Sequence, residues 1–339
     1  MAVIEAQGLT KVFRVFDRRP GFFGSLRDIV DRRYRELRAV DDVSLVIEPG
    51  EIVGYIGPNG AGKSTTIKML TGIVVPTSGT VRVNGFDPQR ERRRYVRTLG
   101  AVFGQRTQLW WDLALVESLE LLRQLYGVSK ADFEQRLKSF HAVLGIDEFM
   151  HTPVRKLSLG QRMKADLAAS LVHNPPVVFL DEPTVGVDVV TKEHLRSFLR
   201  QLREENGTTI LLTTHDMQDI EALCDRIVVI DHGKIMHDGA LEAFKHRYGG
   251  RKRVVIRLQR AIDESGLDAL AREGVSWELV SAVECVALVD TAVAPIAEVL
   301  QQALDGLPVA DIGVEEPTIE RVVKQLYGGA EVIGLGASV

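Results

Sequence analysis

The chain has 339 residues, a formal net charge of −4 at pH 7 and two cysteines, Cys224 and Cys285. The acidic balance argues against nucleic acid binding through overall charge, and two distant cysteines exclude a disulfide framework or a cysteine-rich metal site. A chain of this length can bury a large core and a smaller second one. No stretch reaches the roughly 20 apolar residues that a membrane-spanning helix needs, so the sequence predicts a cytosolic protein.

Strands and helices are expected to alternate through the first two thirds of the chain. This order predicts an α/β core with a largely parallel sheet, beside a small antiparallel region. An arginine-rich insertion at about 17–38 interrupts the N-terminal strands. The expected strands are 2–7, 43–47, 52–56, 80–83, 177–180, 209–213 and 226–230, and the expected helical segments are 63–70, 116–149, 163–173, 191–205 and 216–222.

The sequence changes in character after about residue 250. The expected order is strand, helix, two strands, helix and strand, which predicts a ferredoxin-like module. We therefore expect a first domain at 1–245, an α+β accessory domain at 250–328 and a disordered tail at 329–339. Within the second domain the expected elements are strands at 254–258, 276–288 (two strands) and 309–314, and helices at 264–272, 294–304 and 318–327.

The strongest motif is a glycine-rich run that ends in lysine and serine, Gly57-Pro58-Asn59-Gly60-Ala61-Gly62-Lys63-Ser64. It matches G-x-x-x-x-G-K-[ST] and lies between an expected strand and an expected helix, as a phosphate-binding loop does. Lys63 would reach the β- and γ-phosphates, and the Ser64 hydroxyl would bind Mg²⁺. The nucleotide-binding residues predicted here are Gly57, Asn59, Gly60, Ala61, Gly62, Lys63, Ser64 and Thr65.

A second motif is an apolar run that ends in two acids, Val177-Val178-Phe179-Leu180-Asp181-Glu182. An acid at the carboxyl end of a parallel strand lies where such sheets bind their ligands. We expect Asp181 in the shell of the Mg²⁺ ion and Glu182 as the general base for the attacking water. Together the two motifs predict a nucleoside triphosphatase.

A third motif narrows the family. The run Leu157-Ser158-Leu159-Gly160-Gln161-Arg162 precedes an expected helix and resembles the signature motif of ABC ATPases. The resemblance covers about residues 1–245 and includes six motifs in the family's order. It implies a P-loop NTPase core of the ABC type, with a RecA-like parallel sheet, an antiparallel β subdomain and a helical signature subdomain at about 106–173.

Four further positions match family motifs. Gln105 matches the glutamine loop, which binds the metal and reports to the transport subunit, and Asp188 matches the D-loop, which communicates across the dimer. His215 matches the switch histidine, which holds the γ-phosphate and orients water, and Phe13 matches the aromatic that stacks on adenine. The resemblance thus implies catalysis by Glu182, His215, Lys63 and Gln105, and Mg²⁺ held by Ser64, Gln105 and Asp181.

The resemblance also implies the partners. In the family two ATPase domains face head to tail, and each ATP lies between one phosphate loop and Ser158, Gly160 and Gln161 of the other domain. We therefore expect a second ATPase subunit, most simply as a homodimer. The chain would lie on the cytoplasmic face of the plasma (inner) membrane and touch the membrane through permease subunits, without binding nucleic acid.

Three features resemble the subunits that serve ABC-2 type permeases, most of which export. They are the insertion before the phosphate loop, the run at 102–113 that contains Trp110-Trp111-Asp112, and the ending Glu316-Pro317-Thr318-Ile319-Glu320. The two tryptophans would line the groove for a helix of the membrane subunit, or pack in the core. The basic segment at 17–38 would lie near lipid headgroups or the permease, or form an ordinary surface helix.

Two positions depart from the family pattern. Leu159 replaces the first glycine of the usual Ser-Gly-Gly-Gln, and Val185 replaces the serine that usually begins the D-loop. Because Glu182 and His215 are unaffected, we expect an altered fit in a competent site.

The sequence is compared with three functions other than that of an exporter subunit. An importer ATPase subunit would use the same chemistry. A soluble ABC ATPase acting on ribosomes or DNA is disfavoured by the single phosphate loop and by the lack of a long heptad run between Lys63 and Ser158. A non-catalytic regulatory module is disfavoured because Lys63, Glu182 and His215 are all present.

Overall fold

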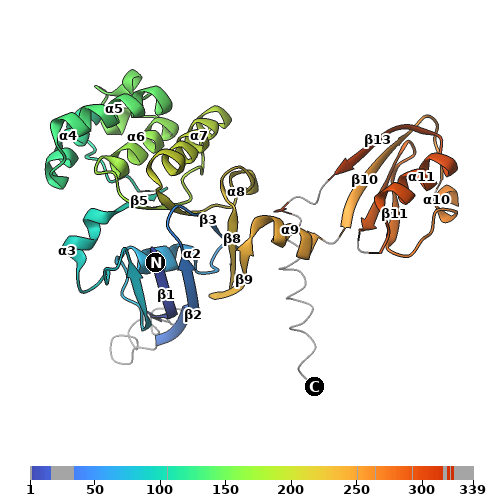
Figure 1. Ribbon diagram of the computed structural model, residues 1–339, viewed down its shortest axis with the longest axis horizontal. Coiled ribbons are helices and arrows are strands. Elements are labelled where there is room, and N and C mark those ends of the chain that lie inside the picture. Colours follow the sequence, from blue (N-terminus) through green and yellow to red (C-terminus); the bar gives the residue numbers. More distant parts are fainter. Residues whose placement is uncertain are drawn as a thin grey trace, which may run out of the picture. The chain divides into compact units, whose positions relative to one another are not determined.

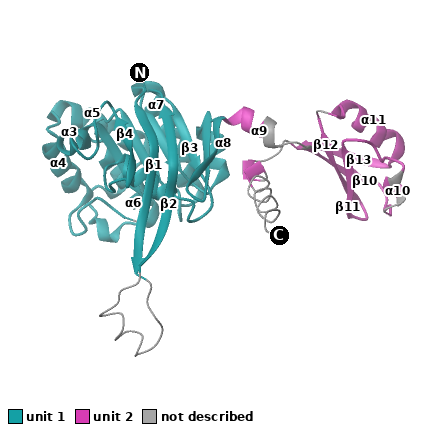
Figure 2. Cartoon of the chain, turned by 90° about the horizontal axis from the view of Figure 1, so that it is seen from below, with its two compact units in different colours: residues 1–239 teal, residues 240–339 magenta. Residues whose placement is uncertain are grey.

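A computed structural model describes residues 2–16, 34–104, 106–249, 251–263, 265–291, 293–315, 319–320 and 322–323 (Figure 1). The tail expected at 329–339 and residues 17–33 of the expected insertion lie outside the described residues. The chain forms two compact units, residues 1–239 and 240–339 (Figure 2). Within the part of the chain that the structure describes, no helix is long and apolar enough to cross a bilayer.

The first unit is built on a six-stranded sheet with the order β5-β6-β7-β3-β8-β9. Strands β5, β6, β7, β3 and β8 pair in parallel. Their residues are almost all buried, which is why they appear in the sequence as short continuous apolar runs. The strands are β3 (Ile52–Ile56), β5 (Leu99–Phe103), β6 (Val177–Asp181), β7 (Thr209–Thr213), β8 (Arg226–Asp231) and β9 (Lys234–Ala240).

Seven helices of the described residues belong to this unit. In Figure 1, α4, α5 and α6 lie together and apart from the strands β1 and β2. The stretch predicted as helical over 116–149 is divided at Gly127 and Gly145, which have positive φ angles and end α4 and α5. The helices are α2 (Lys63–Leu70), α3 (Arg92–Tyr95), α4 (Leu115–Tyr126), α5 (Lys130–Leu144), α6 (Leu159–Leu171), α7 (Val189–Asn206) and α8 (Met217–Leu223).

A separate three-stranded antiparallel sheet has the order β2-β1-β4, formed by β1 (Ile4–Phe16), β2 (Tyr34–Ile47) and β4 (Ser78–Val83). Its first two strands are much longer than predicted. Tyr34 pairs with Phe16, and Leu37 pairs with Phe13, so residues 34–38 of the expected insertion are part of a paired strand. The predicted bounds of these strands, 2–7 and 43–47, were therefore wrong, because the charged side chains at 35–38 face solvent on a paired strand and hide the strand pattern.

The second unit contains a four-stranded sheet with the order β11-β12-β10-β13, and every pairing in it is antiparallel. This order is that of a ferredoxin-like module, as predicted. One face packs on α10 and α11 around a core that includes Ile256, Ala287 and Val299. The elements are α9 (Leu241–Gly249), β10 (Arg251–Leu258), α10 (Ser265–Asp268), β11 (Val275–Ser281), β12 (Glu284–Asp290), α11 (Ile296–Gly306) and β13 (Val309–Glu315).

Candidate active site for ATP

The glycine-rich run forms the loop between β3 and α2. Gly62 has φ 109°, and a Cβ there would lie 2.4 Å from the carbonyl oxygen of Ala39. A Cβ at Gly57 would lie 2.3 Å from the carbonyl oxygen of Ile230. Both positions therefore require glycine, and the loop stays close to the sheet with its N–H groups at the start of α2.

Lys63 is buried at the first position of α2. Its ammonium donates hydrogen bonds to the carbonyl oxygens of Gly57 (2.6 Å) and Pro58 (3.0 Å). Burial lowers the pKa of this ammonium, and the nearby carboxylates of Glu182 and Asp181 partly oppose that shift. The geometry places a sheltered cation directly against the loop that would bind the phosphates.

Asp181 ends β6 and gathers two hydroxyl groups around one carboxylate oxygen. Its Oδ1 accepts hydrogen bonds from Ser64 Oγ (3.0 Å) and from Thr213 Oγ1 (2.7 Å). A serine hydroxyl beside a carboxylate is the kind of oxygen donor set that Mg²⁺ uses together with substrate phosphates. The residues predicted for the metal thus fit such an ion at Ser64 and Asp181, while Gln105 lies outside the described residues.

Glu182 and His215 follow β6 and β7 and lie close together. The Nδ1 atom of His215 is 3.8 Å from Oε1 of Glu182. Glu182 has φ 54°, a left-handed conformation that costs a non-glycine residue free energy and is often retained at functional sites. Its N–H donates to the carbonyl oxygen (3.0 Å) and to the hydroxyl (3.1 Å) of Thr213. The sequence did not lead us to assign a role to Thr213. Its position at the end of a predicted strand, two residues before His215, was the available indication.

A cleft of about 440 Å³ opens beside these residues. Ser64, Asp181 and Glu182 line it, together with Phe103, Gly104 and Arg106 at the end of β5. Gly104 leaves no room for a side chain, because a Cβ there would lie 2.3 Å from the carbonyl oxygen of Glu182. The cleft has the size of a small-molecule site, and its lining residues include a serine, two acids and an arginine.

The signature run lies at the start of α6. Ser158 caps this helix: its hydroxyl accepts a hydrogen bond from the N–H of Gln161 (3.1 Å), and the Gln161 side chain accepts one from the N–H of Ser158 (3.0 Å). This reciprocal pair makes the helix start at Leu159, so the predicted start at Met163 was wrong. The free N–H groups of the first turn and the Ser158 hydroxyl form a site where an anion can bind.

Comparisons with known proteins agree with this geometry. The model of the ABC transporter family matches residues 40–185. The ABC transporter ATP-binding protein NatA of Bacillus subtilis is 35% identical over 62% of this chain and 87% of its own length. The linearmycin resistance ATP-binding protein LnrL of the same organism is 30% identical over 88% of this chain and 96% of its own length.

The chain belongs to the ATP-binding subunits of ABC transporters. A solved dimeric ATP-binding cassette in a post-hydrolysis state with ADP and Pi has the same fold, with a TM-score of 0.59, 26% identity and coverage of 70% of this chain and 98% of that one. The predicted fold class and family are thus confirmed. The protein is an ATP-binding and ATP-hydrolysing subunit of such a transporter.

The D-loop and the signature motif of this ABC subunit contact each other within the chain. A Cβ at Gly186, which has φ 71°, would lie 2.6 Å from Cδ2 of Leu159. Leu159, which replaces the family's first glycine, therefore packs against Gly186, and a side chain at position 186 would clash with it. Asp188 caps α7, accepting hydrogen bonds from the N–H (2.9 Å) and the hydroxyl (2.8 Å) of Thr191, and these bonds keep the pKa of Asp188 below its usual value.

Phe13 lies on β1 and is half-buried, with the ammonium of Lys11 5.2 Å from its ring centroid. Asn59 and Gly60, in contrast, are exposed at the tip of the phosphate loop. The stacking role of Phe13 stays a prediction.

Asp166 is a buried carboxylate of α6 that the sequence analysis missed. Its Oδ1 accepts hydrogen bonds from Thr107 Oγ1 (2.8 Å) and from the N–H of Gln108 (3.0 Å), and its carbonyl oxygen accepts one from Gln108 Nε2 (3.0 Å). The helix of the signature motif is thereby tied to the segment that leads to the tryptophan pair. The sequence did offer one indication of a buried acid at this position: Asp166 lies among the small apolar residues of the helix that follows the signature motif.

Burial raises the pKa of Asp166 to about 6, while the hydrogen bonds from Thr107 and Gln108 lower it in part. A raised pKa means that the folded state binds the proton more tightly, so this contribution to stability is full below the unfolded value near 3.8 and is lost as pH rises through about 6. We expect the stability of Asp166→Asn relative to wild type to improve by roughly 2 to 3 kcal/mol between about pH 4 and about pH 7.5. Urea titrations of both proteins measure this difference, and a difference that does not change with pH would contradict it.

Proposed function

We propose that this subunit powers an ABC-2 type exporter, as one of two ATPase domains that bind ATP between them. The support comes first from the relatives. Besides LnrL, the daunorubicin resistance ATP-binding protein DrrA3 of Streptomyces coeruleorubidus is 30% identical over 89% of this chain and 95% of its own length. Export of a drug makes a cell resistant to it, so relatives named for resistance to daunorubicin and linearmycin support an export function.

The geometry supports a separate role for each side chain of the site. Lys63 and the loop N–H groups would hold the β- and γ-phosphates. Glu182 would take a proton from the attacking water, and His215 would orient that water and the γ-phosphate. Mg²⁺, held with Ser64 and Asp181, would neutralise charge that develops on the phosphate oxygens. Gln105 would complete the shell of the metal.

The second half of the site would come from the partner. Ser158, Gly160 and Gln161 of one chain would bind the γ-phosphate on the phosphate loop of the other, using the first turn of α6. Asp188 would carry communication across the same interface. In this arrangement ATP joins the two subunits, and hydrolysis lets them separate.

Exposed tryptophans offer a surface for the membrane subunit. Trp110 and Trp111 are 42% and 50% exposed, and the guanidinium of Arg162 lies 5.9 Å from the ring centroid of Trp111. Aromatic side chains are enriched where proteins bind each other. The proposal places these tryptophans against a permease at the cytoplasmic face of the membrane, with the ATPase attached through that contact.

The test is co-expression with each ABC-2 type permease of the same genome in turn, followed by purification of both proteins in nanodiscs. We expect the two proteins to co-purify and the membrane subunit to raise ATP turnover. Dependence of turnover on an added solute-binding protein would instead identify an importer. Turnover that never responds to the membrane subunit would contradict the transport role.

A further inference from the structure

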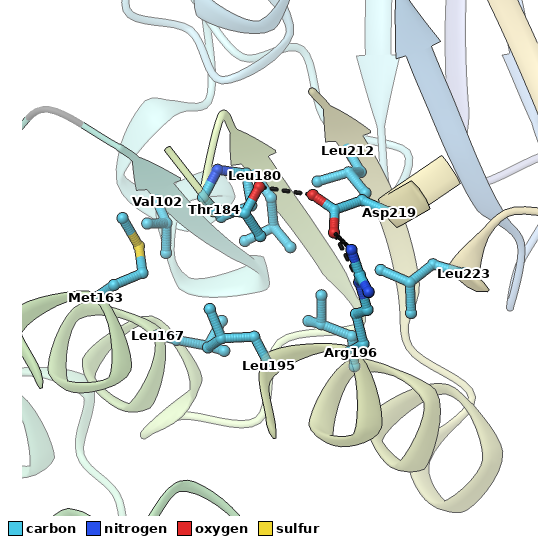
Figure 3. Close-up of a pocket in the computed structure, with 12 residues that line it drawn as sticks. Val102, Met163, Leu167, Leu180, Thr184, Leu195, Arg196, Leu212, Asp219 and Leu223 are labelled. Carbon is cyan, nitrogen blue, oxygen red and sulfur yellow. Dashed lines mark hydrogen bonds and ion pairs between the residues drawn. The ribbon is translucent and has the colours of Figure 1, made fainter. Parts of the chain in front are cut away.

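A buried ion pair lies beneath the hydrolysis residues of the first unit. Asp219 of α8 is completely buried, and Arg196 of α7 is 6% exposed. Nε and Nη2 of Arg196 lie 2.7 Å and 2.6 Å from Oδ1 of Asp219, and Nη1 donates to Oε1 of Glu193 at 2.6 Å. One oxygen of Asp219 is therefore fully engaged by the guanidinium (Figure 3).

The other oxygen of Asp219 accepts hydrogen bonds from two threonines. Thr184 Oγ1 lies 2.6 Å from Oδ2, and Thr214 Oγ1 lies 3.3 Å from the same atom. Thr184 comes two residues after Glu182, and Thr214 comes directly before His215. A single carboxylate thus connects the segments that carry the proposed general base and the proposed γ-phosphate ligand.

The surroundings make this connection rigid. Most side chains around the pair are apolar, and the cavity that remains among them is only about 10 Å³. In such surroundings each hydrogen bond is strong and an unsatisfied partner is costly, so the guanidinium and the two hydroxyls on Asp219 are held in one arrangement. Figure 3 shows the pair among Leu180, Leu195, Leu212 and Leu223.

We propose that the Arg196–Asp219 pair is a positioning unit for hydrolysis, which fixes the distance between Glu182 and His215 through Thr184 and Thr214. The proposal rests on the ATPase function of those two residues. It assigns to the pair no contact with nucleotide. The pair acts through the side chains of Thr184 and Thr214. Thr213 holds the backbone of Glu182 separately, by accepting hydrogen bonds from its N–H.

The chain offers a matched set of variants. Thr184→Val/Thr214→Val keeps the shape of both side chains and removes both hydroxyls, and Thr184→Ser/Thr214→Ser keeps the hydroxyls. Since a misplacement of about 1 Å can cost a reaction roughly 100-fold, we expect the valine variant to lose about 10- to 100-fold in kcat. Its dissociation constant for ATP, measured without Mg²⁺ so that no turnover occurs, should stay within about twofold, because the phosphate loop is untouched.

The serine variant should recover most of the lost kcat. Arg226→Gln is the control for loss of an ion pair, because Arg226 pairs with Asp238 (2.7 Å) and Glu51 (3.2 Å) near the amino ends of the parallel strands, away from Glu182. It should keep wild-type kcat. The wild-type turnover in the same assay tests the ATPase function separately from the positioning role.

Three results would overturn the proposal. One is an unchanged kcat in a folded valine variant. Another is an equal loss of kcat in the serine and valine variants. The third is a parallel loss of kcat, ATP affinity and melting temperature, which would assign the pair to stability alone. Substitution of Arg196 or Asp219 by itself leaves a buried charge unpaired and can prevent folding, which is why the threonine variants carry the test.

Discussion

Replacing Glu182 with glutamine is expected to lower ATP turnover by roughly 10²- to 10⁴-fold while ATP binding is retained. Glutamine keeps the size of the side chain but cannot take a proton from water. The backbone of Glu182 is held in place by its hydrogen bonds to Thr213, and its carboxylate lies 3.8 Å from His215, so the substitution changes the chemistry and leaves the geometry. Single-turnover phosphate release with pre-bound ATP measures the chemical step.

Glu134→Gln provides the matched control for this variant. Glu134 lies on α5 and makes a long ion pair of 3.9 Å with Lys130 at the surface. It should turn over ATP at the wild-type rate. A Glu182→Gln protein that retains wild-type turnover would show that another group accepts the proton, and the assignment of the base would fail.

Replacing Lys63 with alanine is expected to weaken ATP binding by roughly 10- to 100-fold, since hydrogen bonds to charged groups contribute about 1.5 to 3 kcal/mol. The ammonium is buried and bonded to the carbonyl oxygens of Gly57 and Pro58, so it is fixed against the loop that is predicted to bind the phosphates. The lost cation would also remove charge stabilisation during hydrolysis. Equilibrium binding of a fluorescent ATP analogue measures the first effect.

Lys130→Ala is the control, because the Lys130 side chain is 84% exposed on α5. Its ATP affinity should equal that of wild type. If Lys63→Ala bound ATP as tightly as wild type, phosphate recognition would rest on the loop backbone alone and the role assigned to Lys63 would be wrong.

Strong local patterns explain what the sequence predicted well. Strand β3 and helix α2 begin and end at the predicted residues because a buried apolar run, a glycine loop and a short amphipathic segment follow one another. Strand β7 was predicted with equal accuracy. Most of the motif residues follow directly from such elements, because they lie at a strand end, in the loop after it or at a helix start, whereas Phe13 lies within β1.

Features that depend on distant partners were not predictable. Strand β5 was missed because its Gly100 weakens the strand pattern, and the reason for this glycine lies elsewhere: a Cβ would be 2.6 Å from the carbonyl oxygen of Ser170. The pairing of Arg196 with Asp219 spans 23 residues, and that of Thr107 with Asp166 spans 59. Nothing in the local pattern of either segment identifies its partner.

Two copies of this ATPase subunit are proposed to share each ATP. Sedimentation of purified Glu182→Gln protein, with Mg-ATP and without nucleotide, tests this proposal most directly, because this variant should bind ATP and retain it. We expect a monomer that becomes a homodimer only when Mg-ATP is present. A protein that binds ATP yet stays monomeric would contradict the shared site between two identical chains.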